Sequence, residues 1–99
     1  MNNMKAYWIN RCHVFDMNKY SKYIELAGTA IASHGGKFLV RGGDQVYLEG
    51  KGLERTVVVE FQSKDQALKA YNSAEYQKAL KFSKESAERQ VVIVEAIES

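Results

Sequence analysis

The chain has 99 residues, of which 45% are hydrophobic and 26% are charged, and its formal net charge is +2. This length suits one domain over residues 1–99, and the composition excludes a disordered chain. The charges are interspersed and the apolar stretches are short, so the sequence indicates neither nucleic-acid binding nor a membrane span. The single Cys12 cannot form an internal disulfide, and the start lacks an apolar signal segment, so we expect a cytoplasmic protein.

The first half of the chain predicts a strand, a helix and a second strand. Residues Lys5–Val14 are rich in aromatic and β-branched side chains, which favour a strand. Asp16 is the expected N-cap of a helix. The apolar residues of this helix recur at three- and four-residue spacing: Tyr20, Tyr23, Ile24, Ala27 and Ile31. Gly35-Gly36 predicts the helix end, and Lys37–Arg41 predicts a short strand that stops at Gly42-Gly43.

The second half predicts a strand, a broken helix and a final strand. Arg55–Phe61 is a continuous β-branched run, typical of a strand. Ser63 and Gln66 match a capping box, which predicts a helix start. Asn72-Ser73 breaks this helix, and the serine can cap a further one. Gln90–Ile97 predicts the closing strand.

The order β-α-β-β-α-β predicts an α+β fold of the ferredoxin-like type. Right-handed crossovers then place both helical segments on one face of a four-stranded antiparallel sheet. The strands Arg55–Phe61 and Gln90–Ile97 are largely apolar on both faces. Because a face exposed to water would not be so apolar, we expect a second copy of the chain to cover it. The predicted assembly is a homodimer.

Two long segments resemble a known family. The first is Gly35-Gly36-Lys37-Phe38-Leu39-Val40-Arg41-Gly42-Gly43. The second contains Val59-Glu60-Phe61-Gln62-Ser63, then Ala67, then Tyr71-Asn72-Ser73-Ala74-Glu75-Tyr76-Gln77. Both are similar to motifs of the domain-of-unknown-function 1330 family, as are the aromatic Tyr20 and Tyr23 and the closing Val91–Glu95. The resemblance covers nearly the whole chain. It implies a dimeric α+β barrel, in which two sheets pack face to face, and it implies no agreed activity.

Three positions depart from the family pattern. Gln62 and Ala74 stand where the family favours proline, which loosens turns. Ala70 stands where the family favours tryptophan, and this loss could open or reshape a pocket.

The main candidate for ligand binding is Arg41-Gly42-Gly43. A guanidinium beside flexible glycines can hold a carboxylate or a similar anion in bidentate fashion. Alternatively, Arg41 pairs with Glu60 or Glu95, and the glycines form a bulge or a turn. The segment is not a phosphate loop, because it lacks the Gly-x-x-x-x-Gly-Lys-Ser/Thr pattern.

Three further residues are candidates for the same site. Glu60 and Glu95 each interrupt an apolar strand, and burial without a partner would raise the pKa of either carboxyl and suit it to act as a base. The alternatives are an ion pair with Arg41 or Arg55, or an exposed place at the mouth of the barrel. Tyr7 could direct its hydroxyl into a cavity.

The histidines and the cysteine have simpler explanations. His34 suits the end of the first helix, where an imidazolium interacts favourably with the helix dipole. Strand alternation places Cys12 and His13 on opposite faces, so the two are not partners. The histidines lack the ordered ligand spacing of a metal site. No motif predicts a cofactor.

The predicted function is the binding of a small organic molecule or anion in a cavity near Arg41-Gly42-Gly43. Two alternatives remain: a non-catalytic structural or interaction dimer with no ligand, and a cofactor-independent oxygenase or isomerase, by analogy of fold alone. The sequence does not decide whether the protein is an enzyme. A pocket in which Arg41 converges with Glu60, Glu95 or Tyr7 would favour ligand binding, and a filled interior would exclude it.

Overall fold

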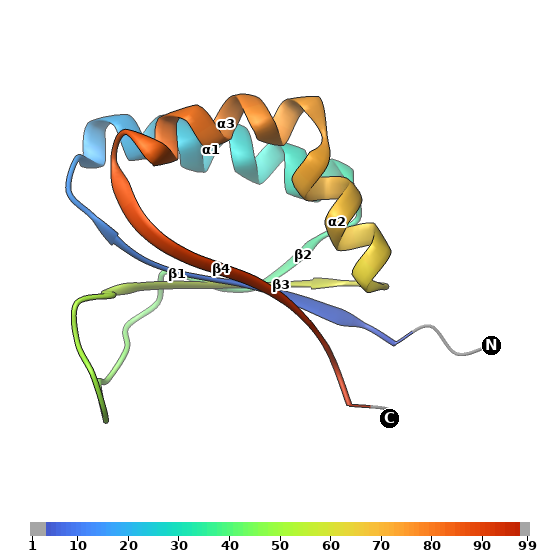
Figure 1. Ribbon diagram of the computed structural model, residues 1–99, viewed down its shortest axis with the longest axis horizontal. Coiled ribbons are helices and arrows are strands. Elements are labelled where there is room, and N and C mark those ends of the chain that lie inside the picture. The colour runs from blue at the N-terminus through green and yellow to red at the C-terminus, as the bar shows by residue number, and fades with distance from the viewer. Residues whose placement is uncertain (1–3, 98–99) are drawn as a thin grey trace.

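The computed structural model describes residues 4–97, and it has three helices on one face of a four-stranded antiparallel sheet (Figure 1). In chain order the elements are β1 (Ala6–Val14), α1 (Met17–Ser33), β2 (Lys37–Arg41), β3 (Arg55–Phe61), α2 (Lys64–Asn72), α3 (Ala74–Lys84) and β4 (Ala87–Glu95). The strand order in the sheet is β2-β3-β1-β4. The predicted ferredoxin-like α+β fold is confirmed, with its second helical segment divided into α2 and α3.

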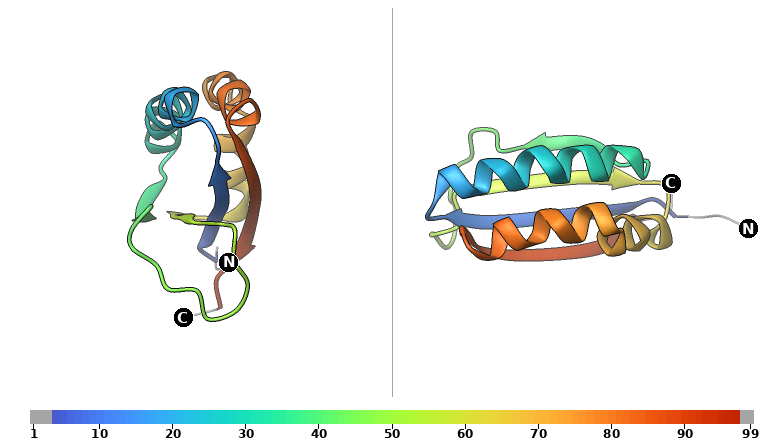
Figure 2. Two further views of the ribbon diagram at one scale, coloured as in Figure 1. Left: turned by 90° about the vertical axis from the view of Figure 1, so that its left-hand side faces the viewer. Right: turned by 90° about the horizontal axis from the view of Figure 1, so that it is seen from above.

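The core lies between the sheet and the helices. α1 and α3 run side by side above the strands (Figure 2). Alternate residues of β1 and β3 face these helices, and Trp8 pairs with Val59 across the two strands. The largest side chains of this layer are almost fully buried: Trp8, Tyr20, Phe61 and Tyr76. The predicted apolar stripe of the first helix is therefore confirmed, since four of its five residues are buried: Tyr20, Tyr23, Ala27 and Ile31.

A side chain caps the N-terminus of each helix. Asp16 Oδ1 accepts a hydrogen bond from Lys19 N at 3.2 Å. Ser63 Oγ accepts from Gln66 N, and Ser73 Oγ accepts from Tyr76 N, both at 3.1 Å. The capping box expected at Ser63 forms only in part, because the Gln66 amide donates to the carbonyl of His34 at 2.7 Å. This bond ties the start of α2 to the end of α1.

The predicted start of the last strand was wrong. β4 begins at Ala87, three residues before Gln90, and it pairs with the second half of β1 as far as Val14. Glu88 and Gln90 face the open side of the sheet, and Arg89 faces the helices. The residues before Gln90 are polar and do not indicate a strand, but pairing with β1 extends β4 back to Ala87.

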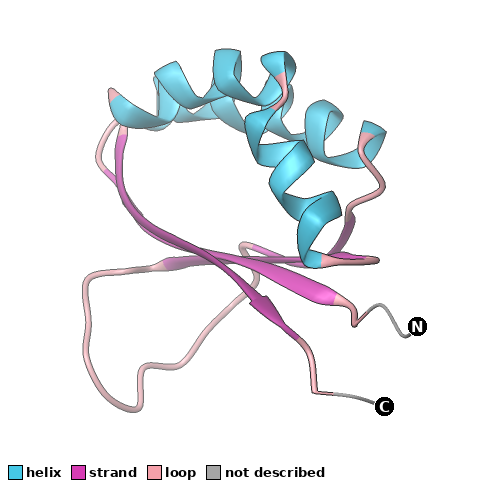
Figure 3. Ribbon diagram, turned by 45° about the vertical axis from the view of Figure 1, so that its right-hand side comes forward, coloured by secondary structure: helices cyan, strands magenta, loops and turns pink. Residues whose placement is uncertain are grey.

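The open face of the sheet and the loop of residues 42–54 lie on the side away from the helices (Figures 1 and 3). On this face Val92 is 55% exposed and Val94 is 48% exposed. At the tip of the loop, Val46 is 80% exposed and Leu48 is 91% exposed. This side of the molecule therefore exposes several apolar side chains, as the sequence predicted. No helix within residues 4–97 is both long and apolar enough to cross a membrane.

We expect Gly36→Ala to destabilise the fold by about 1–3 kcal/mol, the usual cost of adding atoms to a packed core. A Cβ at this position would lie 2.5 Å from Ile31 Cγ2, 2.8 Å from Phe61 Cζ and 2.9 Å from Val59 Cγ1. Gly43→Ala is the matched control, since nothing lies within 4 Å of its added Cβ. Urea unfolding of the two variants tests this, and equal midpoints would contradict it.

Candidate functional site

A cavity lies between α1 and the helix-facing side of β1, β2 and β3. Its walls are mainly apolar and aromatic, and they include Trp8, Tyr20, Ile24 and Phe38. The polar groups that line it are few, chiefly Asn10 and two arginines described below. The cavity encloses about 20 Å³, room for about one water molecule, and about 360 Å³ when its open mouth is included. Its lining, apolar with a few polar groups, is typical of a small-molecule site, whereas its enclosed volume is smaller than that of such sites.

Arg41 stands at the mouth of this cavity. It ends β2, and its Cζ atom lies 4.2 Å from the centroid of the Phe38 ring, as in a cation–π contact. Gly28 of α1 allows the guanidinium to lie against the helix, because a Cβ there would be 2.6 Å from Nη2. Within residues 4–97, no carboxylate lies within ion-pair distance of Arg41. Its charge is therefore available to a ligand.

Arg55 brings a second guanidinium to the same cavity. It begins β3, and it packs so closely against Gly42 that an added Cβ would collide with Nη1. Gly42 has a φ of 71°, a conformation that also favours glycine. Arg55 Nε is buried and has no hydrogen-bond partner in the described part of the chain. An unpartnered buried N–H costs about 1–3 kcal/mol, which an acceptor on a ligand would recover.

Asn10 supplies an unpartnered acceptor inside the cavity. The residue is only 2% exposed, and its Nδ2 donates to Tyr20 Oη at 3.4 Å. Its Oδ1 has no hydrogen-bond partner among the described residues. Tyr20 Oη also lies 3.5 Å from Cys12 Sγ. Burial, reinforced by Cys12, raises the pKa of Tyr20, so its hydroxyl stays protonated at neutral pH.

A second polar cluster joins α1, α3 and β4. Tyr23 Oη and Tyr76 Oη lie 2.8 Å apart. Arg89 donates to both hydroxyls, from Nη1 to Tyr23 at 2.7 Å and from Nη2 to Tyr76 at 3.2 Å. Its Cζ atom lies 4.7 Å from the centroid of the Tyr23 ring. Arg89 was not among the predicted site residues, because it lies before the predicted start of the last strand at Gln90. Extending the alternation of that strand backwards would have placed Arg89 on the helix face.

The residues predicted for the site do not all converge. Arg41 lines the cavity and Gly42 packs against Arg55, whereas Gly43 is exposed with nothing near its Cβ position. Tyr7 and Glu60 are cross-strand neighbours on the open face of the sheet.

The predicted carboxylates lie away from Arg41. Glu60 Oε1 lies 3.6 Å from Lys5 Nζ, so Glu60 has a partner of its own. Glu95 is exposed at the end of β4. The alternative in which Arg41 pairs with one of these carboxylates does not occur in residues 4–97.

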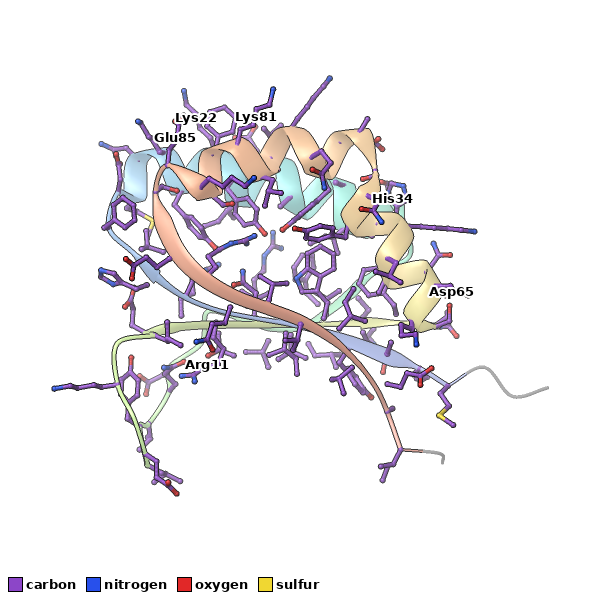
Figure 4. All side chains as sticks on the ribbon, in the orientation of Figure 1. Arg11, Lys22, His34, Asp65, Lys81 and Glu85 are labelled. Carbon is purple, nitrogen blue, oxygen red and sulfur yellow. The ribbon has the colours of Figure 1, made fainter. Side chains whose placement is uncertain are left out.

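Other charged residues lie outside the cavity. Lys22, Lys81 and Glu85 lie on the outer side of the helices, and Arg11 lies at the open side of the sheet (Figure 4). Arg11 also has protein acceptors, since it donates to Thr56 Oγ1 and to the carbonyl of Leu53. Within residues 4–97, the side chains of the two cavity arginines, Arg41 and Arg55, have no such acceptors.

The histidines have local partners. His13 Nδ1 lies 3.0 Å from Glu54 Oε1, and the pKa of Glu54 is lowered by the backbone N–H of Val14 and then by His13. His34 Nδ1 lies 2.8 Å from the carbonyl oxygen of Ala30, in the last turn of α1. Among the described residues, no group of three or more His, Cys, Asp or Glu is placed to hold a metal ion.

Comparisons with solved structures identify several similar folds. RPA0582, a protein of unknown function from Rhodopseudomonas palustris, is 13% identical with a TM-score of 0.81, over 99% of this chain and 86% of that chain. A dimeric protein of unknown function with a ferredoxin-like fold from Bacteroides fragilis is 16% identical with a TM-score of 0.66, over 93% and 96%. SnoaB, a cofactor-independent oxygenase from Streptomyces nogalater, is 11% identical with a TM-score of 0.65, over 97% and 96%. At these identities the likenesses show a shared fold.

Comparison with proteins of curated function finds no match. The model of one family, the domain of unknown function DUF1330, matches residues 5–97. Because this match spans almost the whole described chain, the protein belongs to the DUF1330 family.

Proposed function

We propose that the protein binds a small organic acid in the cavity beneath α1. Arg41 and Arg55 hold the acid group, and the apolar walls hold the body of the ligand. One observation carries this proposal: two guanidinium groups line one mainly apolar cavity, and neither has a carboxylate partner within residues 4–97. A planar guanidinium matches a carboxylate in bidentate fashion, and such charged hydrogen bonds are strong where water is scarce.

The cavity must widen to admit the ligand. It encloses about 20 Å³, which is less than an organic acid needs. Arg41 is the side chain best placed to move, because it is exposed at the mouth and makes no ion pair within residues 4–97. A ligand that draws the Arg41 guanidinium away from the Phe38 ring would open the cavity and bind to this guanidinium in one step. Asn10 Oδ1 can then accept an N–H or O–H group of the bound molecule.

Catalysis by this site is the second candidate function. SnoaB, described as a cofactor-independent oxygenase, has the same fold. The observation that favours it here is a buried amide, Asn10, beside Trp8 in an apolar cavity. Oxygen consumption, measured while an acid is bound, distinguishes an oxygenase from a binding protein. A non-catalytic dimer would show neither binding nor turnover.

The homodimer is part of the proposal. The open face of the sheet is apolar, and similar folds from Bacteroides fragilis and Thermobifida fusca are described as dimeric. A second copy would cover this face, and the loop of residues 42–54 extends on the same side (Figure 3). The fully buried thiol of Cys12 needs no partner, which suits a single domain working in the cytoplasm.

Trp8 provides the readout for ligand binding, since it is the only tryptophan and it lines the cavity. We expect benzoate or cyclohexanecarboxylate to change its fluorescence saturably. Arg41→Met and Arg55→Met should each weaken binding about 10- to 100-fold, because a charged hydrogen bond contributes about 1.5–3 kcal/mol. The melting temperature of Arg41→Met should stay within about a few degrees of wild type, because an exposed side chain contributes little to stability.

Two controls test whether the acid group matters. Cyclohexanecarboxamide has the same body without the charge, and it should bind at least about tenfold more weakly. Lys69→Met removes an exposed charge on α2 and should leave binding unchanged. If the acid and the amide bind alike, or if no acid gives a saturable change, the proposal is wrong.

A further inference from the structure

Arg89 has no carboxylate partner within residues 4–97. It lies on the helix-facing side of β4, opposite Cys12, and it is half-buried. Its two hydrogen bonds go to tyrosine hydroxyls, which leaves the rest of its five N–H donors without a protein acceptor among residues 4–97. Burying a charge without a counter-charge is costly.

The two tyrosines cannot neutralise this charge. Burial raises the pKa of Tyr23 and of Tyr76, and for Tyr76 the neighbouring Tyr23 raises it further. Both hydroxyls are therefore neutral at physiological pH. Their effect is geometric, because two hydrogen bonds and one ring face fix the plane of the Arg89 guanidinium.

The two carboxylates that are close to Arg89 in the sequence, Glu85 and Glu88, do not compensate its charge. Glu85, at the end of α3, lies 3.6 Å from Lys19. Glu88 belongs to the opposite face of β4. The positive charge of Arg89 is therefore uncompensated in the described part of the chain.

A groove of about 290 Å³ lies beside Arg89, between α3 and β4. Lys84 and Ser83 line it with Arg89, and its apolar side includes Leu80 and Val91. Among residues 4–97, its two charged lining residues are both cations, and no carboxylate lines it. Lys84 makes no ion pair within residues 4–97. The groove differs from the α1 cavity in place and in lining residues, and it offers more room.

We propose that this groove is a second anion site, in which Arg89 is the fixed anchor and Lys84 is the flexible second cation. Its ligand is a compact oxyanion, a phosphate or a carboxylate, either free or at the end of a larger molecule. The guanidinium is already oriented, so little ordering accompanies binding. The site does not depend on ligand binding beneath α1.

Trp8 can report this site as well. Its ring lies 4.9 Å from the Tyr76 ring and 5.7 Å from the Tyr71 ring, centroid to centroid, and Tyr71 lines the groove. We would titrate the protein at constant ionic strength with inorganic phosphate, acetate and glycerol 3-phosphate, following Trp8 fluorescence and melting temperature. Tighter binding of glycerol 3-phosphate would indicate that the natural ligand carries its phosphate group on a larger molecule. Tighter binding of acetate would indicate a carboxylate ligand.

Variants assign the response to the groove. We expect Arg89→Met to weaken anion binding about tenfold or more and Lys84→Met about a few fold, whereas Lys69→Met, at an exposed residue that does not line the groove, leaves it unchanged. Lys84 is exposed, so its variant tests the site even if Arg89→Met does not fold. No saturable response to any of the three anions, or a response that both variants retain, would overturn the proposal.

Discussion

A negative charge in the centre of the open sheet face is expected to convert the proposed dimer into a monomer. Val58 of β3 is the best position, since it lies between Val40 of β2 and Ile9 of β1. A symmetric interface presents the same patch twice, so Val58→Asp places two carboxylates in it. Burying an unpaired charge costs several kcal/mol, so we expect the dissociation constant to rise by about a thousandfold or more. Light scattering at micromolar concentration measures the change.

Leu68→Asp is the control for this substitution. Leu68 is an apolar residue of α2 that is 42% exposed, and it lies away from the open face of the sheet. The same chemical change there should leave the dimer intact. A wild-type protein of monomer mass would contradict the proposed assembly. If Val58→Asp stays dimeric, another surface forms the interface.

The fold was predictable because its strongest signals are local. The alternation of β3 and the three- and four-residue spacing in α1 each place one set of side chains against the core, as the structure confirms. The caps at Asp16 and Ser73 also need only their own neighbours. The start of β4 was not predictable in this way, because pairing with β1 determines it.

The site was harder to predict because it depends on irregular pairing. The ladder between β2 and β3 shifts register between Phe38 and Val40. This irregularity brings Arg41 to the same helix-facing side as Phe38, whereas strict alternation would place the two on opposite faces. The sequence singled out Arg41 by its glycines, but it gave no sign that Arg55 would join it. Glu60 was a candidate because it interrupts an apolar strand, and Tyr7 because its hydroxyl could enter a cavity, but both lie on the other face of the sheet.

The stability of the protein is expected to fall steeply above pH 10. Tyr20, Tyr23 and Tyr76 are buried, and burial is the main reason that the pKa of each is raised. Below a pH of about 10, the ordinary tyrosine pKa, these groups are protonated in both the folded and the unfolded chain, so they contribute no pH dependence. Above it the unfolded chain loses these protons and the folded chain keeps them. Each buried tyrosine then removes up to about 1.4 kcal/mol of unfolding free energy per pH unit, until its folded pKa is reached.

Urea unfolding between pH 9 and pH 11 measures this slope, and the ultraviolet absorbance of tyrosinate follows the ionisation itself. Tyr23→Phe removes one of the three buried hydroxyls, so it should reduce the slope by about a third whatever it does to stability at neutral pH. Tyr47→Phe is the matched control, because Tyr47 is 41% exposed in the loop of residues 42–54. An equal loss of slope in the two variants would mean that the alkaline transition does not come from the buried hydroxyls. Ionisation of all the tyrosines in the folded protein near pH 10 would mean that burial does not hold these protons, and the predicted loss of stability above pH 10 would then not come from them.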